Sequence, residues 1–129
     1  MSRSRPANGE PSPLKSYPLD VRIVETAVGA YRFAAPEHVG RTFADPEAAR
    51  LYADVYFAVN GFVEANTGDR GVPPEVVQAD KHALAAYLVV QTSVDWVASF
   101  YGSEPQRIER FLTRVREQAA EVRERAAAK

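Results

Sequence analysis

A long apolar stretch from Pro74 to Tyr101 constrains the fold of this chain more than any other part of the sequence. Read as one helix, it carries apolar side chains over more than half of its circumference, which is broader than the apolar face of a surface helix. Pro74 suits a first helical turn, and Gly102 suits the position where a helix ends in a left-handed turn. Its charged residues leave no apolar run of about 18 residues, so it does not read as a membrane helix. The sequence therefore predicts a central helix that other helices contact from several sides.

Size and composition favour a single intracellular domain. The chain has 129 residues, the size of one ordinary domain. It contains no cysteine, which excludes disulfides, thiolate metal sites and a cysteine nucleophile. The formal net charge is -1, so no overall field attracts nucleic acid or an acidic membrane. Because the N-terminus lacks the apolar segment of a secretory signal, we expect a soluble, cytoplasmic protein.

The composition predicts two parts, a disordered tail at residues 1–17 and a helical domain at residues 18–129. The tail is rich in proline, serine and arginine and contains almost nothing that can be buried. We interpret it as a solubilising terminus. Its basic residues make a nucleic-acid-binding arm the alternative.

The domain is expected to begin with a helix from Asp20. Asp20 is a candidate N-cap, and the apolar residues that follow it recur at helical spacing. A strand over Val21–Val24 is the alternative, because Gly29 weakens a helix by about 1 kcal/mol relative to alanine. Pro36 biases the preceding residue away from helical geometry and is expected to end the element.

The next helix has the clearest start in the chain. Asp45, Pro46 and Glu47 read as an N-cap, a first-turn proline and an acid at the positive end of the helix dipole. Its expected apolar face consists of Leu51, Tyr52, Val55, Tyr56, Ala58, Val59, Phe62 and Val63. Its expected polar face consists of Arg50, Asp54, Asn60 and Glu64. Phe57 falls on the polar side, where an exposed aromatic is ordinary or serves a partner, and Gly68 is the predicted stop.

The last helix follows a tight corner. Ser103 and Gln106 have the spacing of a capping box directly after the Gly102 stop signal. A narrow apolar stripe follows, with the alternating three- and four-residue spacing of a coiled-coil seam. It consists of Ile108, Phe111, Leu112, Val115, Ala119, Val122 and Ala126. Arginines and glutamates are interleaved around the stripe, which indicates a solvated or charge-paired face rather than a phosphate-binding one.

We identify no catalytic, cofactor-binding or metal-binding residues. Neither His38 nor His82 belongs to the Glu-x-x-His pattern of carboxylate-bridged di-metal bundles. Asp80 and His82 are expected to point about 200° apart on a helix. Asp95 lies in the middle of the apolar stretch, and burial there would require an arginine partner or a raised pKa.

Arg32 and His38 have the Arg-x(5)-His spacing used by small all-helical dimeric ribonucleases of the HEPN type. Pro36 falls inside the motif, where that family has continuous helix, so we do not assign the chain to it. The spacing supplies a testable enzyme hypothesis in which Arg32 and His38 act on RNA.

We therefore predict an all-α, single-domain fold of about four helices packed as a bundle around the central apolar helix. The leading functional hypothesis is a small intracellular interaction or assembly protein without catalytic activity. We expect a protein partner or self-association, and among these we favour a dimer paired through the seam of the last helix. We expect no association with a membrane. The alternatives are a nucleic-acid-associated accessory protein, using the N-terminal and last-helix arginines, and a HEPN-like ribonuclease.

Overall fold

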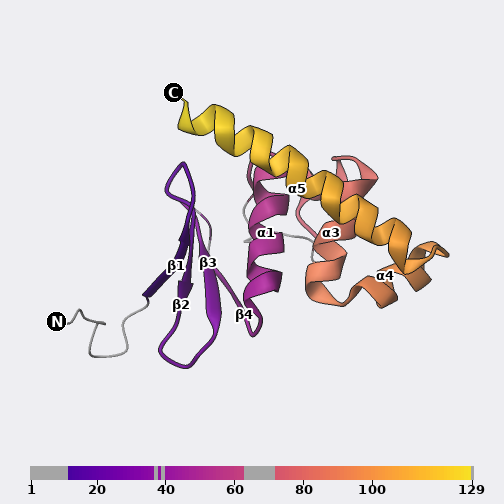
Figure 1. Cartoon of the computed structure of the whole chain (residues 1–129), viewed down its shortest axis with the longest axis horizontal. Helices are drawn as coiled ribbons and strands as arrows, with labels where there is room; N and C mark the ends of the chain where they lie inside the picture. Colours follow the sequence, from indigo (N-terminus) through magenta and orange to yellow (C-terminus); the bar gives the residue numbers. More distant parts are fainter. Residues whose placement is uncertain (1–11, 37, 39, 63–71, 129) are drawn as a thin grey trace.

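The computed structural model describes residues 12–36, 38, 40–62 and 72–128. Within them, a sheet of four antiparallel strands precedes five helices. The strands pair in sequence order and are β1 (Ser12–Ser16), β2 (Arg22–Glu25), β3 (Tyr31–Ala34) and β4 (Arg41–Phe43). The helices are α1 (Pro46–Ala58), α2 (Pro74–Val77), α3 (Lys81–Gln91), α4 (Val94–Tyr101) and α5 (Pro105–Ala127). Figure 1 shows α1 standing between the sheet and α3, with α5 lying across both helices.

The sheet shows that the all-α, helical-bundle prediction is wrong, and the chain has a mixed α/β fold. Strand β2 occupies the region of the expected first helix, so the strand alternative over Val21–Val24 was the correct one. Ile23 lies opposite Phe33 across the β2–β3 pair, and both side chains are fully buried. The apolar residues of this segment fit the spacing of a helix and also that of a strand. Pairing with β3 favours the strand. Gly29, with φ of 83°, serves the turn between the two strands.

Strand β1 includes the end of the predicted disordered tail. Ser12–Ser16 pairs with β2 through a bulge near Pro13, so the prediction of disorder is wrong for this segment. Backbone pairing of an edge strand needs few buried side chains, and composition therefore did not reveal it. Asp20 is not a helix cap but lies in the β1–β2 turn, where Leu19 and Asp20 both have positive φ. Residues 1–11 lie outside the described residues.

Helix α1 begins as predicted and ends earlier than predicted. The Asp45 carboxylate accepts a hydrogen bond from the N–H of Glu47 at 3.2 Å, as expected of the N-cap. The helix ends at Ala58, and Asn60 then adopts positive φ. The predicted stop, Gly68, lies outside the described residues. Phe57 was expected to face solvent but is only 2% exposed. Tyr17, which follows β1, and Arg123 of α5 cover that side of the helix.

The stretch predicted as one central helix is three helices, which is a second correction. The Asp80 side chain accepts from the N–H of Ala83 and starts α3, and the Ser93 side chain accepts from the N–H of Trp96 and starts α4. Both are polar N-cap residues inside the apolar run, and each allows the chain to change direction. The left-handed helix end at Gly102, with φ of 65°, is confirmed. The broad apolar surface thus belongs to helices that bury different faces.

Helix α1, rather than the stretch from Pro74 to Tyr101, is the most enclosed element. Five consecutive residues of α1, from Leu51 to Val55, are buried, including Asp54. The main apolar core joins inner residues of the sheet to α1, α3 and α5. A smaller cluster joins α3, α4 and the start of α5, with Ala85, Val97, Ala98 and Ile108 at its centre.

Helix α5 buries the predicted seam inside its own chain. Ile108, Leu112, Val115 and Ala119 are buried, and Val122 packs against the main core. The predicted capping box does not form, since the N-cap residue is Glu104 and no side chain caps the helix. Pro105 occupies the first turn instead. The seam predicted to pair two copies is therefore largely covered within the chain, and pairing of two copies remains a prediction.

Candidate functional site

His38 lies in a cluster of aromatic rings rather than on a helix. Its ring contacts Phe33, Tyr52, Tyr56 and Phe62, with centroid distances between 5.0 and 6.2 Å. The backbone N–H of Gly40 donates to its Nδ1 at 2.8 Å, so the neutral ring carries its proton on Nε2. Nε2 lies 2.9 Å from the hydroxyl oxygen of Tyr52, and the proton on Nε2 points to that oxygen. His38 therefore links the loop after β3 to helix α1.

Arg32 and His38 meet at Gly40. The guanidinium of Arg32 lies against Gly40 so closely that a Cβ there would be 2.7 Å from Arg32 Nη2. Gly40 also has φ of 89°, which disfavours any other residue. The two residues of the ribonuclease hypothesis are thus neighbours in space, but they lie on strand β3 and the loop that follows it. This strand-and-loop setting does not supply the all-helical scaffold that the Arg-x(5)-His spacing implies.

A second polar contact in this region joins the sheet to α3. Arg41 Nη1 donates to the hydroxyl of Tyr87 at 3.3 Å, and Tyr87 is fully buried. The Arg41 guanidinium also covers the rings of Phe43 and Tyr52, each 5.6 Å from their centroids. The sequence analysis did not single out Arg41 or Tyr87. The two residues are 46 positions apart, so no pattern in the nearby sequence indicates their contact.

Asp80 and His82 lie closer together than predicted. Asp80 precedes the helix as its N-cap, so the helical angle between the two residues does not apply, and His82 Nδ1 lies 3.4 Å from Asp80 Oδ1. Partial burial acts to raise the pKa of Asp80, but hydrogen bonds from Ala83 and Gln118 and the neighbouring His82 lower it overall. In the described part of the chain, no group of three His, Asp or Glu side chains has the arrangement of a metal site.

Among the described residues, the buried carboxylate is Asp54, which was predicted to lie on the polar face of its helix. It is 8% exposed and accepts a hydrogen bond from Arg123 Nη1 at 2.9 Å. Arg116 Nε lies 4.0 Å away. Burial raises the pKa of Asp54, against the lowering influence of Arg123 and Arg116. The ion pair connects α1 to α5, and the Arg123 guanidinium also covers the rings of Tyr17 and Phe57.

Helix α4 presents two large aromatic side chains to solvent. Trp96 is 48% exposed and Phe100 is 62% exposed. The two side chains are one helical turn apart, and their rings stack with centroids 5.3 Å apart and planes 11° apart. Val97 and Ala98 on the opposite side of α4 are buried. We call the exposed side, with Trp96 and Phe100, the α4 aromatic face.

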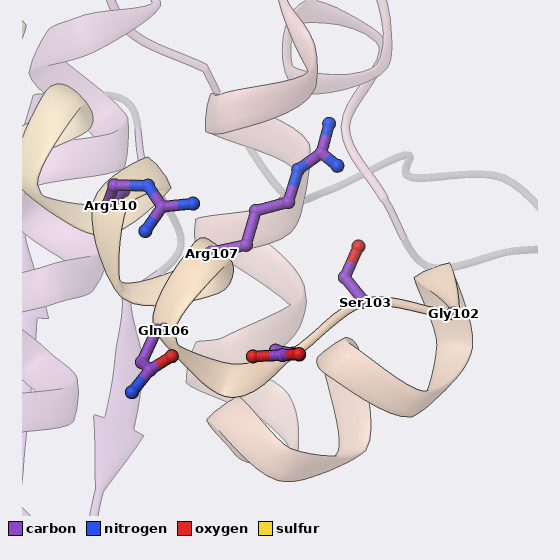
Figure 2. Close-up of a pocket in the computed structure, with 6 residues that line it drawn as sticks. Gly102, Ser103, Gln106, Arg107 and Arg110 are labelled. Carbon is purple, nitrogen blue, oxygen red and sulfur yellow. The ribbon is translucent and has the colours of Figure 1, made fainter.

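Charged residues lie close to both ends of helix α4. Asp95 is exposed in the first turn of α4, so the burial considered from the sequence does not occur. A pocket of about 300 Å³ lies at the other end, at the corner into α5. Gly102, Ser103, Glu104, Gln106, Arg107 and Arg110 line it. Figure 2 shows the side chains of Arg107 and Arg110 extending from the first turns of α5, after the corner at Gly102 and Ser103.

Comparison of the chain with protein families, curated proteins and solved structures found no match. Within the described residues, none of the helices combines the length and apolar character needed to cross a membrane. The function therefore has to be argued from the surface and the polar clusters themselves.

Proposed function

We propose that this protein is a non-enzymatic, cytoplasmic interaction or assembly module that docks a protein surface on the α4 aromatic face. The exposure of Trp96 and Phe100 carries this proposal. Single exposed apolar residues are normal on protein surfaces, but two stacked aromatic rings on one helix face form a contiguous patch. Trp and Phe are also enriched at protein interfaces, and Trp is prominent among the residues that dominate binding energy.

The polar clusters support a structural role rather than catalysis. His38 uses Nδ1 and Nε2 in contacts with Gly40 and Tyr52, and Asp54 is bound to Arg123. Each cluster ties together elements that are distant in sequence. A carboxylate with a raised pKa also occurs in a plain structural ion pair, so Asp54 alone does not indicate an acid–base catalyst.

Site-specific photocrosslinking tests the proposal. A photoreactive phenylalanine analogue at Phe100, introduced in the cell that makes the protein, is expected to capture a second polypeptide. The same analogue at Thr113, an exposed residue of α5, is the matched control. A polypeptide adduct at Phe100 but not at Thr113 supports the docking surface. An equal yield at both positions, or no adduct at Phe100, contradicts it.

A second candidate function is binding of single-stranded nucleic acid at the same face. The observation that favours it is a pair of exposed stacked rings on α4 followed along the chain by Arg107 and Arg110, because nucleic-acid bases stack on aromatic side chains and phosphates bind cations. Asp95 and Glu104 are exposed carboxylates in the same part of the chain and oppose phosphate, so we rank this function second. Trp96 is the sole tryptophan, and salt-sensitive quenching of its fluorescence by a single-stranded oligonucleotide would establish it.

A further inference from the structure

A pocket of about 210 Å³ lies between the β1–β2 turn, the end of α1 and the last turns of α5. Leu19 of that turn, Pro36 after β3 and Val122 of α5 line it, together with residues at the end of α1. We call it the turn pocket. Figure 1 shows α4 beside the start of α5, at the opposite end of that helix, so the turn pocket is separate from the α4 aromatic face.

The lining of the turn pocket is mainly apolar and includes two aromatic rings. Tyr56 and Phe57 contribute rings whose centroids are 5.8 Å apart and whose planes are 86° apart. Phe57 is 2% exposed, and Tyr17 and Arg123 contact its ring, so its position is fixed by the core. None of the described residues that line the pocket is charged, and Asn60 adds one side-chain amide. Such a lining accepts another ring through edge-to-face or offset contacts and disfavours an ion.

Two residues that line the turn pocket have left-handed backbone conformations, Leu19 with φ of 65° and Asn60 with φ of 63°. Asparagine tolerates this region, but leucine disfavours it because its Cβ crowds the following carbonyl oxygen. The Leu19 residue is 62% exposed, so burial of its side chain offsets little of that cost. Strained residues of this kind cluster at ligand sites. The strain at Leu19 therefore indicates that its side chain serves the pocket rather than the turn.

We propose that the turn pocket binds a small, neutral, largely apolar molecule of about one ring. An apolar cavity of about 150 Å³ holds benzene, whereas pockets for cofactors and drug-sized ligands measure about 300–1,000 Å³. The turn pocket lies between these sizes, which fits a single ring with a short substituent and is too small to enclose a nucleotide. The exposed side chain of Asn60 can hydrogen-bond one polar group of the ligand, such as a hydroxyl. This inference goes beyond the proposed function and does not depend on it.

Fluorine NMR of ring-sized probes, added to the full chain at neutral pH, tests the pocket. The probe is 4-fluorophenol, which is neutral and carries one hydroxyl, and 4-fluorobenzoate is the charged control of similar size. We expect saturable broadening of the 4-fluorophenol signal with a dissociation constant of about 1 mM or lower, since so small a probe makes few contacts. The benzoate should bind at least about tenfold more weakly, because its charge would lose water without gaining a partner. No saturable binding of 4-fluorophenol up to about 10 mM, or equal binding of both probes, overturns the proposal.

A variant that fills the pocket locates the probe. Val122→Phe adds a ring to a residue that lines the turn pocket, and it should weaken binding of 4-fluorophenol at least about tenfold, because the space is then occupied. Val28→Phe is the matched control, since it makes the same change at a residue that is 88% exposed in the β2–β3 turn, and it should leave binding unchanged. Circular dichroism checks that both variants remain folded. Equal binding by Val122→Phe and wild type would mean that the probe binds elsewhere, which overturns the proposal.

A second pair of variants separates binding from stability. Asn-Gly is the favoured pair in a two-residue turn with positive φ at both positions, so Leu19→Asn and Asp20→Gly each introduce the preferred residue. Neither should lower the urea midpoint. Only Leu19→Asn removes a side chain from the pocket, and it should weaken binding of 4-fluorophenol at least about threefold, whereas Asp20→Gly should not. A lower urea midpoint for Leu19→Asn would show that Leu19 serves the fold, and unchanged binding would show that it does not shape the site. Either result overturns the assignment of Leu19 to a ligand pocket.

Discussion

Replacing Arg123 with alanine tests whether the ion pair between α1 and α5 stabilises the fold. The change removes a 2.9 Å charge-assisted hydrogen bond to Asp54 and leaves a mostly buried carboxylate with weaker partners. A hydrogen bond to a charged group contributes about 1.5–3 kcal/mol. Loss of the guanidinium from the faces of Tyr17 and Phe57 adds about 0.5–1 kcal/mol for each ring.

Two features reduce that sum. Arg116, with Nε 4.0 Å from Asp54, can move closer, and the Asp54 side chain retains 12% exposure to water. We allow about 1 kcal/mol for both, within the range of a partly exposed ion pair. The expected loss of unfolding free energy is therefore about 1.5–4 kcal/mol at neutral pH. Urea denaturation followed by circular dichroism measures it directly.

The dependence on pH gives the same experiment a second readout. Because burial raises the pKa of Asp54 in the folded protein above its usual value of 3.8, the folded state binds this proton more tightly than the unfolded state. This contribution to stability is fully present below the unfolded pKa and is lost as pH rises through the folded pKa. Arg123 lowers the pKa of Asp54, so its removal should raise the pKa of Asp54 in the folded protein further.

The deficit of Arg123→Ala relative to wild type should therefore be smaller near pH 4, where mainly the loss of the two ring contacts remains, and should grow towards pH 7. Arg125→Ala is the matched control, since Arg125 is an exposed arginine of the same helix and should change stability by less than about 0.5 kcal/mol. The reasoning is refuted if Arg123→Ala costs no more than Arg125→Ala. It is also refuted if the deficit is the same at both ends of the pH range.

Three further predictions follow from the backbone. Gly40→Ala should lower unfolding free energy more than Gly29→Ala, because both glycines have positive φ but only Gly40 has the Arg32 guanidinium where the methyl group would lie; equal losses would contradict this contact. Ser93→Ala should cost about 1 kcal/mol through loss of the N-cap of α4, measured in urea, and no change would mean that the cap is not needed. Deletion of residues 1–16 removes β1 and should lower the thermal midpoint, whereas an unchanged midpoint would mean that β1 adds nothing to stability.

Local signals in the sequence predicted the parts of the fold that local chemistry determines. The start of α1 at Asp45 and the left-handed end of α4 at Gly102 were both predicted, because a cap depends on a few adjacent residues. The buried stripe of α5 was also predicted, since its spacing matches the helical repeat. These features do not depend on which elements become neighbours.

The errors arose where neighbours decide the structure. Residues from Val21 to Val28 fit a helix or a strand, and the hydrogen bonds to β3 that favour the strand are not visible in their own spacing. Asp80 and Ser93 were treated as polar positions of one long helix. Both are residue types that favour the N-cap, so each could have predicted the start of a new helix. Once the stretch is divided, Trp96 no longer belongs to a core helix.

The candidate surface could not be predicted for the same reason. Trp96 and Phe100 lie in the stretch that was predicted to be a central helix contacted from several sides. Only the packing of Val97 and Ala98 against α3 and α5 shows that the other side of α4 is exposed. The burial of Asp54 likewise depends on Arg123, which lies 69 residues away. No local pattern near either residue signals that contact.

The position of α5 after the other described elements has a consequence for synthesis on the ribosome. The sheet uses only sequential antiparallel pairings, so its strands can pair as soon as they emerge. Helix α1 follows at once, but the side that carries Asp54 is covered by α5, which is translated after the other described elements. Until α5 emerges, the nascent chain exposes the apolar surface and the Asp54 carboxylate that α5 covers in the folded protein. Truncated or stalled products that lack α5 should therefore be recognised by chaperones and proteases rather than persist as folded fragments.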